Sequence, residues 1–361
     1  MNVYASRKKR GFLENDIIVK LILFCSGILF MIHTNSMARK LNFSPYDYMT
    51  TADHQSLRYG IWYSPKEKQK GTILLLNGRT EFMEKYSETI EELNHIGFNV
   101  YSFDWRGQGL SSRMLENKHK GFIDDYKVYL NDLDLFVTKI VKPESVHPLI
   151  IIAHSMGGHI ALRFMHDHSG VADMAVLTSP MIDIFESRLP KSLIKLITKI
   201  AIKSGFRHFY TIGSRDYTDE KFKGNDLTSD PVRFTDAKNA ITNNPDLALG
   251  GATYGWLSAT LKSIDILTQP GFAEEISTPI LMVTAGNDKI VSIQAQKKIC
   301  TKLPNCELKE IPDARHEIFK ETDTVRSILW REFERFINAK STSCHTSFKK
   351  DENCCYIRTG Q

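Results

Sequence analysis

The chain has 361 residues, of which 42% are hydrophobic and 25% charged, and its formal net charge is +5. This length fits one large globular domain with an insertion, and the composition is ordinary for such a fold. No basic patch with interleaved aromatic residues stands out, so nucleic acid is not an expected partner. The sequence has no CxxC pair, HExxH motif or Walker A motif, and we therefore expect neither a metal nor another cofactor.

Residues 1–37 predict a segment separate from the rest of the chain. A basic cluster at 7–10 precedes an apolar run at 17–32, and the uninterrupted part of that run covers only residues 21–32. A membrane-spanning helix needs about 20 apolar residues, so this run is more typical of the hydrophobic region of a signal peptide. The basic flank favours a cytoplasmic N-terminus if the segment inserts into a bilayer.

Three interpretations of this N-terminal segment remain open. It can anchor the protein to a membrane, which in a bacterium would be the inner membrane, and this is the interpretation we favour. It can be a signal cleaved after Ala38, which would export the protein. It can also be an upstream extension, with translation starting at Met37 and a cytoplasmic product.

Strand-like and helix-like segments then alternate. Strands are predicted at 57–63, 72–76, 99–105, 149–153, 174–178 and 279–285, several of them from apolar runs rich in β-branched residues, and residues 307–311 can form a last strand. Amphipathic stretches predict helices at 82–95, 124–141 and 159–166. This alternation indicates an α/β fold with a mostly parallel sheet and helices on both of its faces.

The alternation is interrupted in the middle of the chain. We therefore expect an α/β core formed by residues 38–180 and 271–340, with residues 181–270 inserted as a helical cap over the active site. A cap of this kind shapes an apolar pocket and excludes water. The polar stretch at 341–361 predicts a disordered tail.

One cap segment, residues 190–206, has the pattern of a basic amphipathic helix. Its lysines recur every four residues, at Lys191, Lys195, Lys199 and Lys203, and its apolar residues are Leu193, Leu196, Ile197 and Ile200. Such a helix can lie on an anionic membrane surface. It can equally be a cap helix that packs on the body of the protein with solvated lysines.

The most informative segment is PLIIIAHSMGGHI at residues 148–160. It predicts a strand, a sharp turn carrying Ser155, and a helix. That is the geometry of a nucleophile elbow, which exposes a serine hydroxyl above a parallel sheet, and Ala153 replaces the first glycine of the usual G-x-S-x-G pattern.

A nucleophilic serine needs a histidine base and a carboxylate that orients the histidine. In this type of fold the acid and then the histidine follow the serine along the chain. Asp288 comes directly after the predicted strand at 279–285, and His316 lies in the loop behind the strand at 307–311. We therefore predict a catalytic triad of Ser155, Asp288 and His316.

The same chemistry requires backbone N–H groups for the oxyanion that forms during the reaction. Met156, which follows the nucleophile, is expected to supply one, and Arg79, in the loop after the strand at 72–76, the other. Gly78 allows the backbone of that loop to approach the substrate closely. Gly78 and Trp256 are candidate substrate-binding residues, although core packing is an equal alternative for Trp256.

These motifs resemble those of the α/β-hydrolases, in the branch that contains lysophospholipases L2 and monoacylglycerol lipases and belongs to the S33 group of serine hydrolases. The matching segments are NGRTE at 77–81, DWRGQGLS at 104–111, AHSMGG at 153–158, GND at 286–288 and RHE at 315–317. The resemblance implies the same triad and oxyanion residues. Asn77 and Gln108 differ, because many relatives carry histidine at both positions, and this puts fine substrate selectivity in question. For Arg106 we expect a structural ion pair.

The sequence therefore predicts a serine carboxylic ester hydrolase that releases fatty acid from single-chain lipids, lysophospholipid or monoacylglycerol, through an acyl-enzyme at a membrane surface. A short-chain esterase or an S33-type peptidase is the alternative, and a peptidase would need cap carboxylates such as Asp216, Asp219 and Glu220. A non-catalytic binding protein is a further possibility, which the intact triad disfavours. The six cysteines do not form an evident disulfide framework, so reduced thiols are expected.

Overall fold

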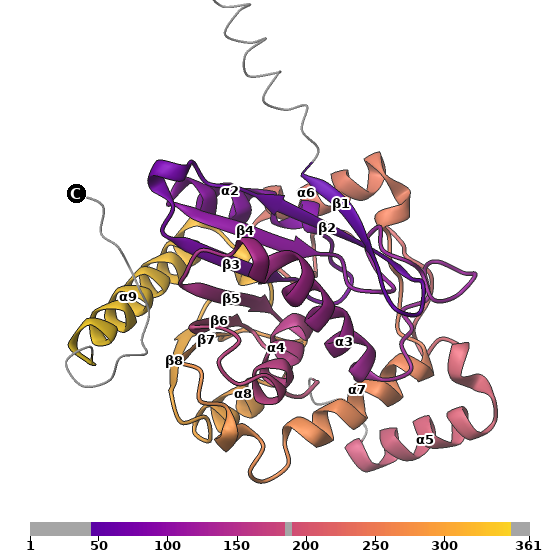
Figure 1. The fold of residues 1–361 in the computed structure, drawn as a ribbon. Coiled ribbons are helices and arrows are strands. Elements are labelled where there is room, and N and C mark those ends of the chain that lie inside the picture. The colour runs from indigo at the N-terminus through magenta and orange to yellow at the C-terminus, as the bar shows by residue number, and fades with distance from the viewer. Residues whose placement is uncertain (1–44, 185–189, 348–361) are drawn as a thin grey trace, which may run out of the picture. The chain divides into compact units, whose positions relative to one another are not determined.

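The computed structural model describes residues 45–184 and 190–347 (Figure 1). The anchor-like segment at 1–37 and the end of the predicted tail lie outside these residues. Within the described ranges, no helix is both long enough and apolar enough to cross a bilayer.

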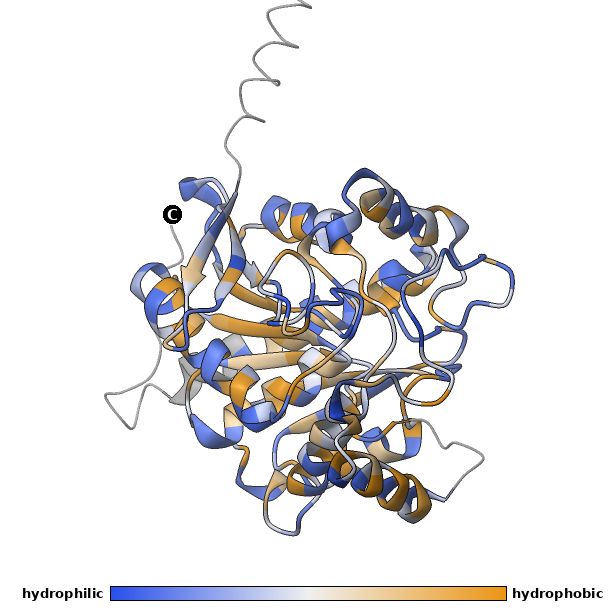
Figure 2. Ribbon diagram, turned by 90° about the vertical axis from the view of Figure 1, so that its right-hand side faces the viewer, coloured by the Kyte–Doolittle hydropathy of each residue, from blue (hydrophilic) through white to orange (hydrophobic). Residues whose placement is uncertain are grey.

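The core is an eight-stranded sheet in the order β1-β2-β4-β3-β5-β6-β7-β8. Strands β1 and β2 pair antiparallel, as do β2 and β4, and all later pairs are parallel. The strands are β1 Tyr46–Thr50, β2 Ser56–Trp62, β3 Gly71–Leu76, β4 Phe98–Phe103, β5 Leu149–His154, β6 Met174–Thr178, β7 Ile280–Ala285 and β8 Cys306–Ile311. The predicted mostly parallel sheet is thus confirmed. In Figure 2 the central strands are orange, as expected for strands that are covered on both faces.

Helices cover both faces of this sheet. Successive residues of a strand point to opposite faces, so Leu74 and Ile151 pack with α3, α4 and α8, whereas Ile73 and Ile150 pack with α2 and α9. These helices are α2 Ser87–His95, α3 Tyr126–Phe136, α4 Met156–Asp167, α8 Ile293–Cys300 and α9 Asp323–Ser347. The two hydrophobic cores fix the sheet between the helical layers, and the loops at the carboxyl ends of the parallel strands are left to build a site.

Several predicted boundaries shift in the structure. The helix expected at 82–95 begins with a 3-10 turn, Met83–Tyr86, and the one expected at 124–141 ends in a π-helical turn, Val137–Val141. The sequence reasoning did not propose β1, α8 or α9. Helix α9 continues to Ser347, which includes the first residues of the predicted tail.

The described residues between β6 and β7, in the part of the chain predicted to form the cap, include three α-helices: α5 Lys191–Lys203, α6 Pro231–Asn243 and α7 Tyr254–Leu267. Helix α7 contacts both α3 of the core and α5, and α6 contacts the 3-10 turn Met83–Tyr86. The segment therefore packs on the core through α6 and α7, while α5 packs on α7.

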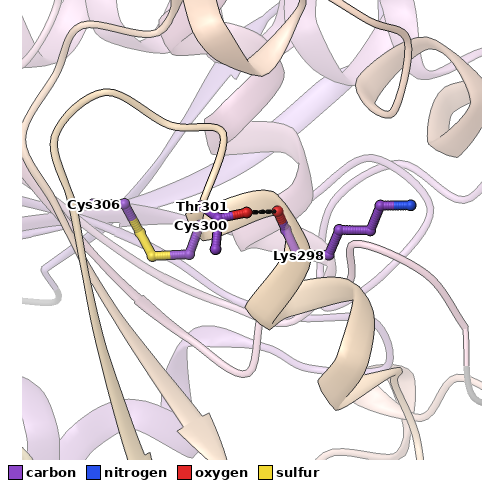
Figure 3. The surroundings of a disulfide bond; sticks show 4 residues. All are labelled: Lys298, Cys300, Thr301 and Cys306. Carbon is purple, nitrogen blue, oxygen red and sulfur yellow. Dashed lines mark hydrogen bonds between the residues drawn. A yellow bond between two sulfur atoms is a disulfide. The ribbon is translucent and has the colours of Figure 1, made fainter.

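The expectation of reduced thiols is wrong for one pair of cysteines. Cys300, the last residue of α8, and Cys306, the first residue of β8, form a disulfide (Figure 3). The connecting turn reverses the chain and brings their Cα atoms to 5.4 Å, a separation that a disulfide can bridge. The end of the helix and the start of the strand therefore meet at this bond.

Candidate active site

Ser155 occupies a strained turn between β5 and α4. Its φ is +50° and its ψ −116°, a conformation that non-glycine residues rarely adopt and that surrounding contacts must hold. Its N–H donates to the carbonyl of Thr178 (3.1 Å), and its own carbonyl accepts from the N–H of Met181 (2.9 Å). A Cβ on Gly157 would lie 2.6 Å from the carbonyl oxygen of Leu76, so glycine is required for α4 to begin this close to β3.

The structure brings the three predicted triad residues together. His316 Nε2 lies 2.9 Å from Ser155 Oγ, and His316 Nδ1 lies 2.7 Å from Asp288 Oδ2. All three side chains are buried. This geometry allows the histidine to accept the serine proton while the carboxylate fixes the orientation of the ring.

Asp288 is held as a carboxylate by the loop that follows it. Burial raises the pKa of Asp288, but the His316 ring and the N–H groups of Ile290 and Val291 outweigh burial, and the pKa lies below its ordinary value. Those two N–H groups donate to Asp288 Oδ1 at 2.8 and 3.1 Å, which leaves Oδ2 for the histidine.

The two predicted oxyanion residues lie next to the serine. Met156 is the first residue of α4, where N–H groups have no partner within the helix. Arg79 follows Gly78, and a Cβ on Gly78 would lie 3.2 Å from Ser155 Cβ and 2.8 Å from Glu81 Oε2. The loop backbone thus passes directly beside the nucleophile, and the role of both N–H groups stays a prediction.

The sequence reasoning missed the residues that hold this loop. Glu81 Oε2 accepts hydrogen bonds from the Gly78 N–H (2.5 Å) and the Tyr86 hydroxyl (2.6 Å). The ammonium group of Lys85 bridges Glu81 (2.8 Å) and Glu317 (2.6 Å), and Glu317 directly follows His316. One buried lysine therefore connects the oxyanion loop to the histidine loop.

The two positions that differ from many relatives lie in contact with each other. Gln108 Nε2 donates to the carbonyl of Gly78 (2.7 Å) and lies 3.2 Å from Asn77 Oδ1. Asn77 Nδ2 donates to the carbonyl of Phe103 at the end of β4 (2.9 Å). Both side chains are buried, so they position the loop rather than touch solvent.

Arg106 has the structural role expected of it. Its guanidinium pairs with both oxygens of Asp132, at 2.9 and 2.7 Å, and also with Asp53. This ion pair fixes the loop after β4 on α3.

A cavity of about 970 Å³ opens over the serine. Its core-side lining includes Gly78, Arg79, Ser155 and His316, and Trp256 lines it from α7. Its apolar lining consists of Phe82, Met181, Ile184, Leu227, Phe234, Ala237, Ile241, Leu249, Trp256, Ile290 and Val291. Many polar and charged side chains line it as well, so the cavity can contact both an apolar and a polar part of a small molecule.

Acidic cap residues also reach this cavity. Asp216, Asp219 and Glu220 all line it. Asp216 Oδ1 accepts hydrogen bonds from the hydroxyl of Tyr210 and the amide of Asn117, and Asp219 forms an ion pair with Lys238 of α6.

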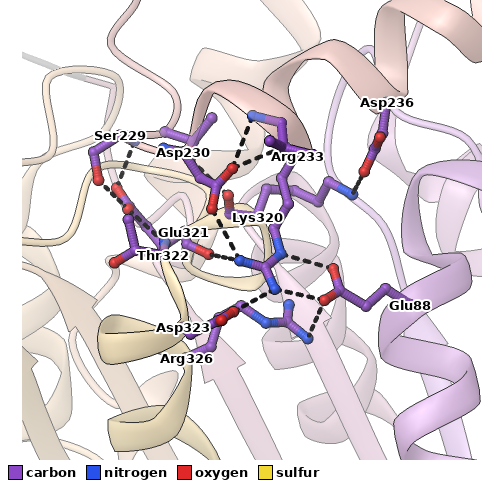
Figure 4. Close-up of polar contacts among 12 residues, drawn as sticks. Glu88, Ser229, Asp230, Arg233, Asp236, Lys320, Glu321, Thr322, Asp323 and Arg326 are labelled. Atoms are coloured by element: carbon purple, nitrogen blue, oxygen red, sulfur yellow. Dashed lines mark hydrogen bonds and ion pairs between the residues drawn. The ribbon is translucent and has the colours of Figure 1, made fainter.

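Arg233 ties α6 to the core below it (Figure 4). Its Nε and Nη2 donate to the two carboxylate oxygens of Glu88 in α2, at 2.8 and 2.6 Å. Nη2 also reaches Asp323 at the start of α9 (2.6 Å), and Nη1 reaches the carbonyl of Glu321 (2.9 Å). A bidentate arginine-carboxylate pair fixes direction as well as distance. This pair therefore fixes the N-terminal end of α6 relative to α2.

In the described ranges, no group of three or more histidine, cysteine, aspartate or glutamate side chains could hold a metal ion.

Comparison with known proteins supports the same chemistry. A family model described as serine aminopeptidase, S33, matches residues 67–323. The lysophospholipase L2 of Escherichia coli strain K12 is 31% identical over 275 residues, which cover 74% of this chain and 80% of that protein. A probable lysophospholipase L2 of Haemophilus influenzae is 29% identical over 297 residues, 82% of this chain and 93% of that protein.

The fold also matches solved structures. A soluble variant of the monoglyceride lipase of Saccharomyces cerevisiae, in complex with a substrate analogue, superposes with a TM-score of 0.64 at 22% identity, and the match covers 82% of this chain and 96% of that one. Agreement at this level establishes the α/β-hydrolase fold that the sequence motifs predicted.

Proposed function

Since the chain belongs to the serine aminopeptidase S33 family of hydrolases, we propose that it is a serine carboxylic ester hydrolase that releases fatty acid from single-chain lipids. The observation that carries the proposal is the Ser155–His316–Asp288 chain of hydrogen bonds beside a cavity whose lining includes a set of apolar side chains. The lysophospholipase relatives and the monoglyceride lipase fold support the lipid substrate.

In the proposed mechanism Ser155 Oγ attacks the ester carbonyl while His316 Nε2 accepts its proton. The N–H groups of Met156 and Arg79 stabilise the oxyanion, and Asp288 stabilises the imidazolium. His316 then donates the proton to the leaving alcohol, which leaves the acyl group on Ser155. A water molecule, deprotonated by His316, attacks the acyl-enzyme and releases the fatty acid.

The test is fatty-acid release from a lysophospholipid and a monoacylglycerol with the same acyl chain, with Ser155→Ala as the control. We expect the variant to lose roughly 10⁴-fold or more in kcat, because a triad without its nucleophile retains little chemistry. A fluorophosphonate probe should label the wild type and not the variant. Failure of the wild type to be labelled or to hydrolyse either lipid would overturn the proposal.

We further propose that α5 and the loop after it bring the enzyme to lipid surfaces. Large apolar side chains are exposed there: Leu196 by 53%, Ile200 by 56%, Phe209 by 56% and Ile212 by 88%. Exposed apolar residues beside lysines match the chemistry of an anionic bilayer. Lys191 and Lys195 also pair with Asp183 and Asp265, which leaves Lys199 and Lys203 more available.

Vesicle sedimentation tests this surface. Replacing Lys199 and Lys203 with glutamine should weaken binding to anionic vesicles, and Ile200→Ser should weaken binding to neutral ones as well. Unchanged binding in both variants would exclude α5 as the contact. The N-terminal segment stays a second candidate for membrane attachment, and deletion of residues 1–37 separates the two contributions.

A peptidase is the second candidate function, because Asp219 and Glu220 line the cavity, as a site for a free amine would require. Hydrolysis of an aminoacyl nitroanilide tests it. Turnover that exceeds that of lipid esters, and that falls in an Asp219→Asn Glu220→Gln variant, would favour the peptidase over the lipid hydrolase.

A further inference from the structure

The side chain of Arg79 lines the cavity beside Ser155 without a carboxylate partner. Its Nη2 donates to the carbonyl of Gly250 (2.9 Å), and its guanidinium lies 4.8 Å from the ring centre of Trp256. Its Nε is buried and has no hydrogen-bond partner in the described part of the chain. A buried polar group without a partner requires an explanation, and a function in binding an anionic ligand is one such explanation.

Two other buried arginines are neutralised by carboxylates, whereas a third, Arg163, has no ion pair among the described residues and also has an Nε without a partner. Arg58 pairs with Asp104 and Glu84, as Arg106 does with Asp132 and Asp53. Arg79 contacts a carbonyl and an aromatic ring but no described carboxylate, and burial lowers the pKa of its guanidinium while nearby tyrosine side chains oppose that effect. A partly buried cation without a counterion costs free energy, and an anionic ligand would reduce that cost.

The position of Arg79 defines where such an anion would lie. Its backbone N–H belongs to the loop beside Ser155, so its guanidinium is within one side-chain length of the reacting ester. In a lysophospholipid only the glycerol chain separates the ester from the phosphate, whereas a monoacylglycerol carries a neutral hydroxyl in place of that phosphate. A guanidinium matches phosphate oxygens with two parallel hydrogen bonds.

We propose that the Arg79 guanidinium binds the headgroup phosphate and thereby selects lysophospholipid over monoacylglycerol. This inference rests on the proposed ester hydrolase function and names the substrate class that the site prefers. Arg79 thus has two separate roles, because its backbone N–H serves the oxyanion and its side chain serves the headgroup.

A second cation lies close to the first. The carbonyl of Arg215 accepts from the Gly251 N–H (2.8 Å), next to the Gly250 carbonyl that Arg79 binds. The Arg215 side chain is exposed, lines the cavity and forms no ion pair with any described carboxylate. It can therefore approach the outer oxygens of a phosphate held by Arg79.

The test compares kcat/KM for 1-acyl lysophosphatidylethanolamine and for the 1-monoacylglycerol with the same chain. Arg79→Met keeps an apolar contact with Trp256 and removes the charge. We expect both values to fall, and the ratio of lysophospholipid to monoacylglycerol to fall a further tenfold to about a hundredfold, mainly through KM, as expected for lost charge-assisted hydrogen bonds. Arg79→Lys should give an intermediate ratio.

Arg113→Met is the matched control. Arg113 also lacks a carboxylate and also binds cap carbonyls, those of Asp246 and Ala248, but it does not line the cavity. If Arg79 only holds the Gly250 loop in place, Arg79→Met and Arg113→Met should each lower the hydrolysis of both lipids by the same factor.

Direct binding gives an independent readout. Glycerol 3-phosphate should bind the Ser155→Ala protein by calorimetry, and the Ser155→Ala Arg79→Met protein at least about tenfold more weakly. An unchanged substrate ratio in Arg79→Met, with both lipids hydrolysed by the wild type, would overturn this inference and leave the proposed function standing. A wild type that hydrolyses neither lipid would overturn both.

Discussion

The side-chain amide of Gln108 lies 3.2 Å from that of Asn77, and the same Gln108 nitrogen donates to the carbonyl of Gly78 beside the nucleophile (2.7 Å). Gln108 Oε1 in turn accepts from the Thr80 N–H (3.3 Å). The two positions that distinguish this chain from many of its relatives are therefore one unit, and that unit supports the oxyanion loop.

Replacing Gln108 with leucine should reduce kcat about tenfold with a smaller effect on KM. The variant removes the donor to the buried carbonyls of Gly78 and Glu81, at about 1–3 kcal/mol for each unsatisfied group, and the loop shifts away from the position it needs in the transition state. Steady-state kinetics on one lysophospholipid measure the effect. An equal rise in KM with unchanged kcat would assign Gln108 to substrate binding instead. Gln108→Glu, which keeps an acceptor for Thr80, is the matched comparison.

Lys85 offers a prediction about stability. Lys85→Met removes the cation between Glu81 and Glu317 and leaves two buried carboxylates unpaired, which should lower the free energy of unfolding by about 3–5 kcal/mol. Urea denaturation measures the change. A loss below about 1 kcal/mol would mean that solvent or another group neutralises the carboxylates. Lys85→Arg keeps the charge and should recover part of the loss.

The same residues predict a dependence on pH. Burial raises the pKa of Glu81, but the Lys85 ammonium and the other donors outweigh it and hold the pKa below its ordinary 4.5. A lowered carboxyl pKa contributes stability that is present above 4.5 and is lost as the pH falls toward the folded value. The unfolding free energy of the wild type should therefore decrease below pH 4.5. In Lys85→Met burial dominates and raises the pKa of Glu81 above its ordinary value. Ionisation of Glu81 should then destabilise the folded protein as the pH rises from 4.5 toward 7.

Much of the site could be predicted because its chemistry depends on residues at the ends of strands. Ser155 and Asp288 each follow a run of apolar β-branched or aliphatic residues, His316 follows the more polar strand β8, and parallel strands bring their carboxyl ends to one edge. Lys85 and Glu317 are 232 residues apart in sequence, and no local pattern relates them. Their contact follows from how the 3-10 turn Met83–Tyr86 and the histidine loop pack, which periodicity does not encode.

The disulfide joins residues that are close in sequence, and the expectation of reduced thiols was wrong for them. Cys300 and Cys306 are close in sequence, but whether they meet depends on the turn at 301–305 and not on the number of intervening residues. The spacing of the two cysteines gives no information on the direction in which the chain leaves the helix. Arg79 shows a third case, since its backbone role was predicted and its side-chain environment was not.

A peptide map tests the disulfide. Trypsin cleavage after Lys298, Lys302 and Lys309 without reductant should yield residues 299–302 joined to residues 303–309, and dithiothreitol should separate them. Replacing both cysteines with serine should cost about 2 kcal/mol of stability, since the bond closes a short loop in the unfolded chain. Finding both cysteines alkylated before reduction would contradict the disulfide in the protein as purified.

The final prediction concerns the Arg233 cluster (Figure 4). The hydrogen bond from Arg233 and the charge of Arg326 lower the pKa of Glu88, and they outweigh burial, which raises it. The Arg233–Glu88 pair is therefore charged at neutral pH. Arg233→Gln removes the bidentate contact from α6 to α2, and amide hydrogen exchange in residues 231–243 should become about tenfold faster. Lys238→Gln, which removes only the exposed pair with Asp219 from the same helix, should leave that exchange unchanged. Equal exchange in both variants would show that apolar packing of Phe234, and not the ion pairs, holds the cap helix over the cavity.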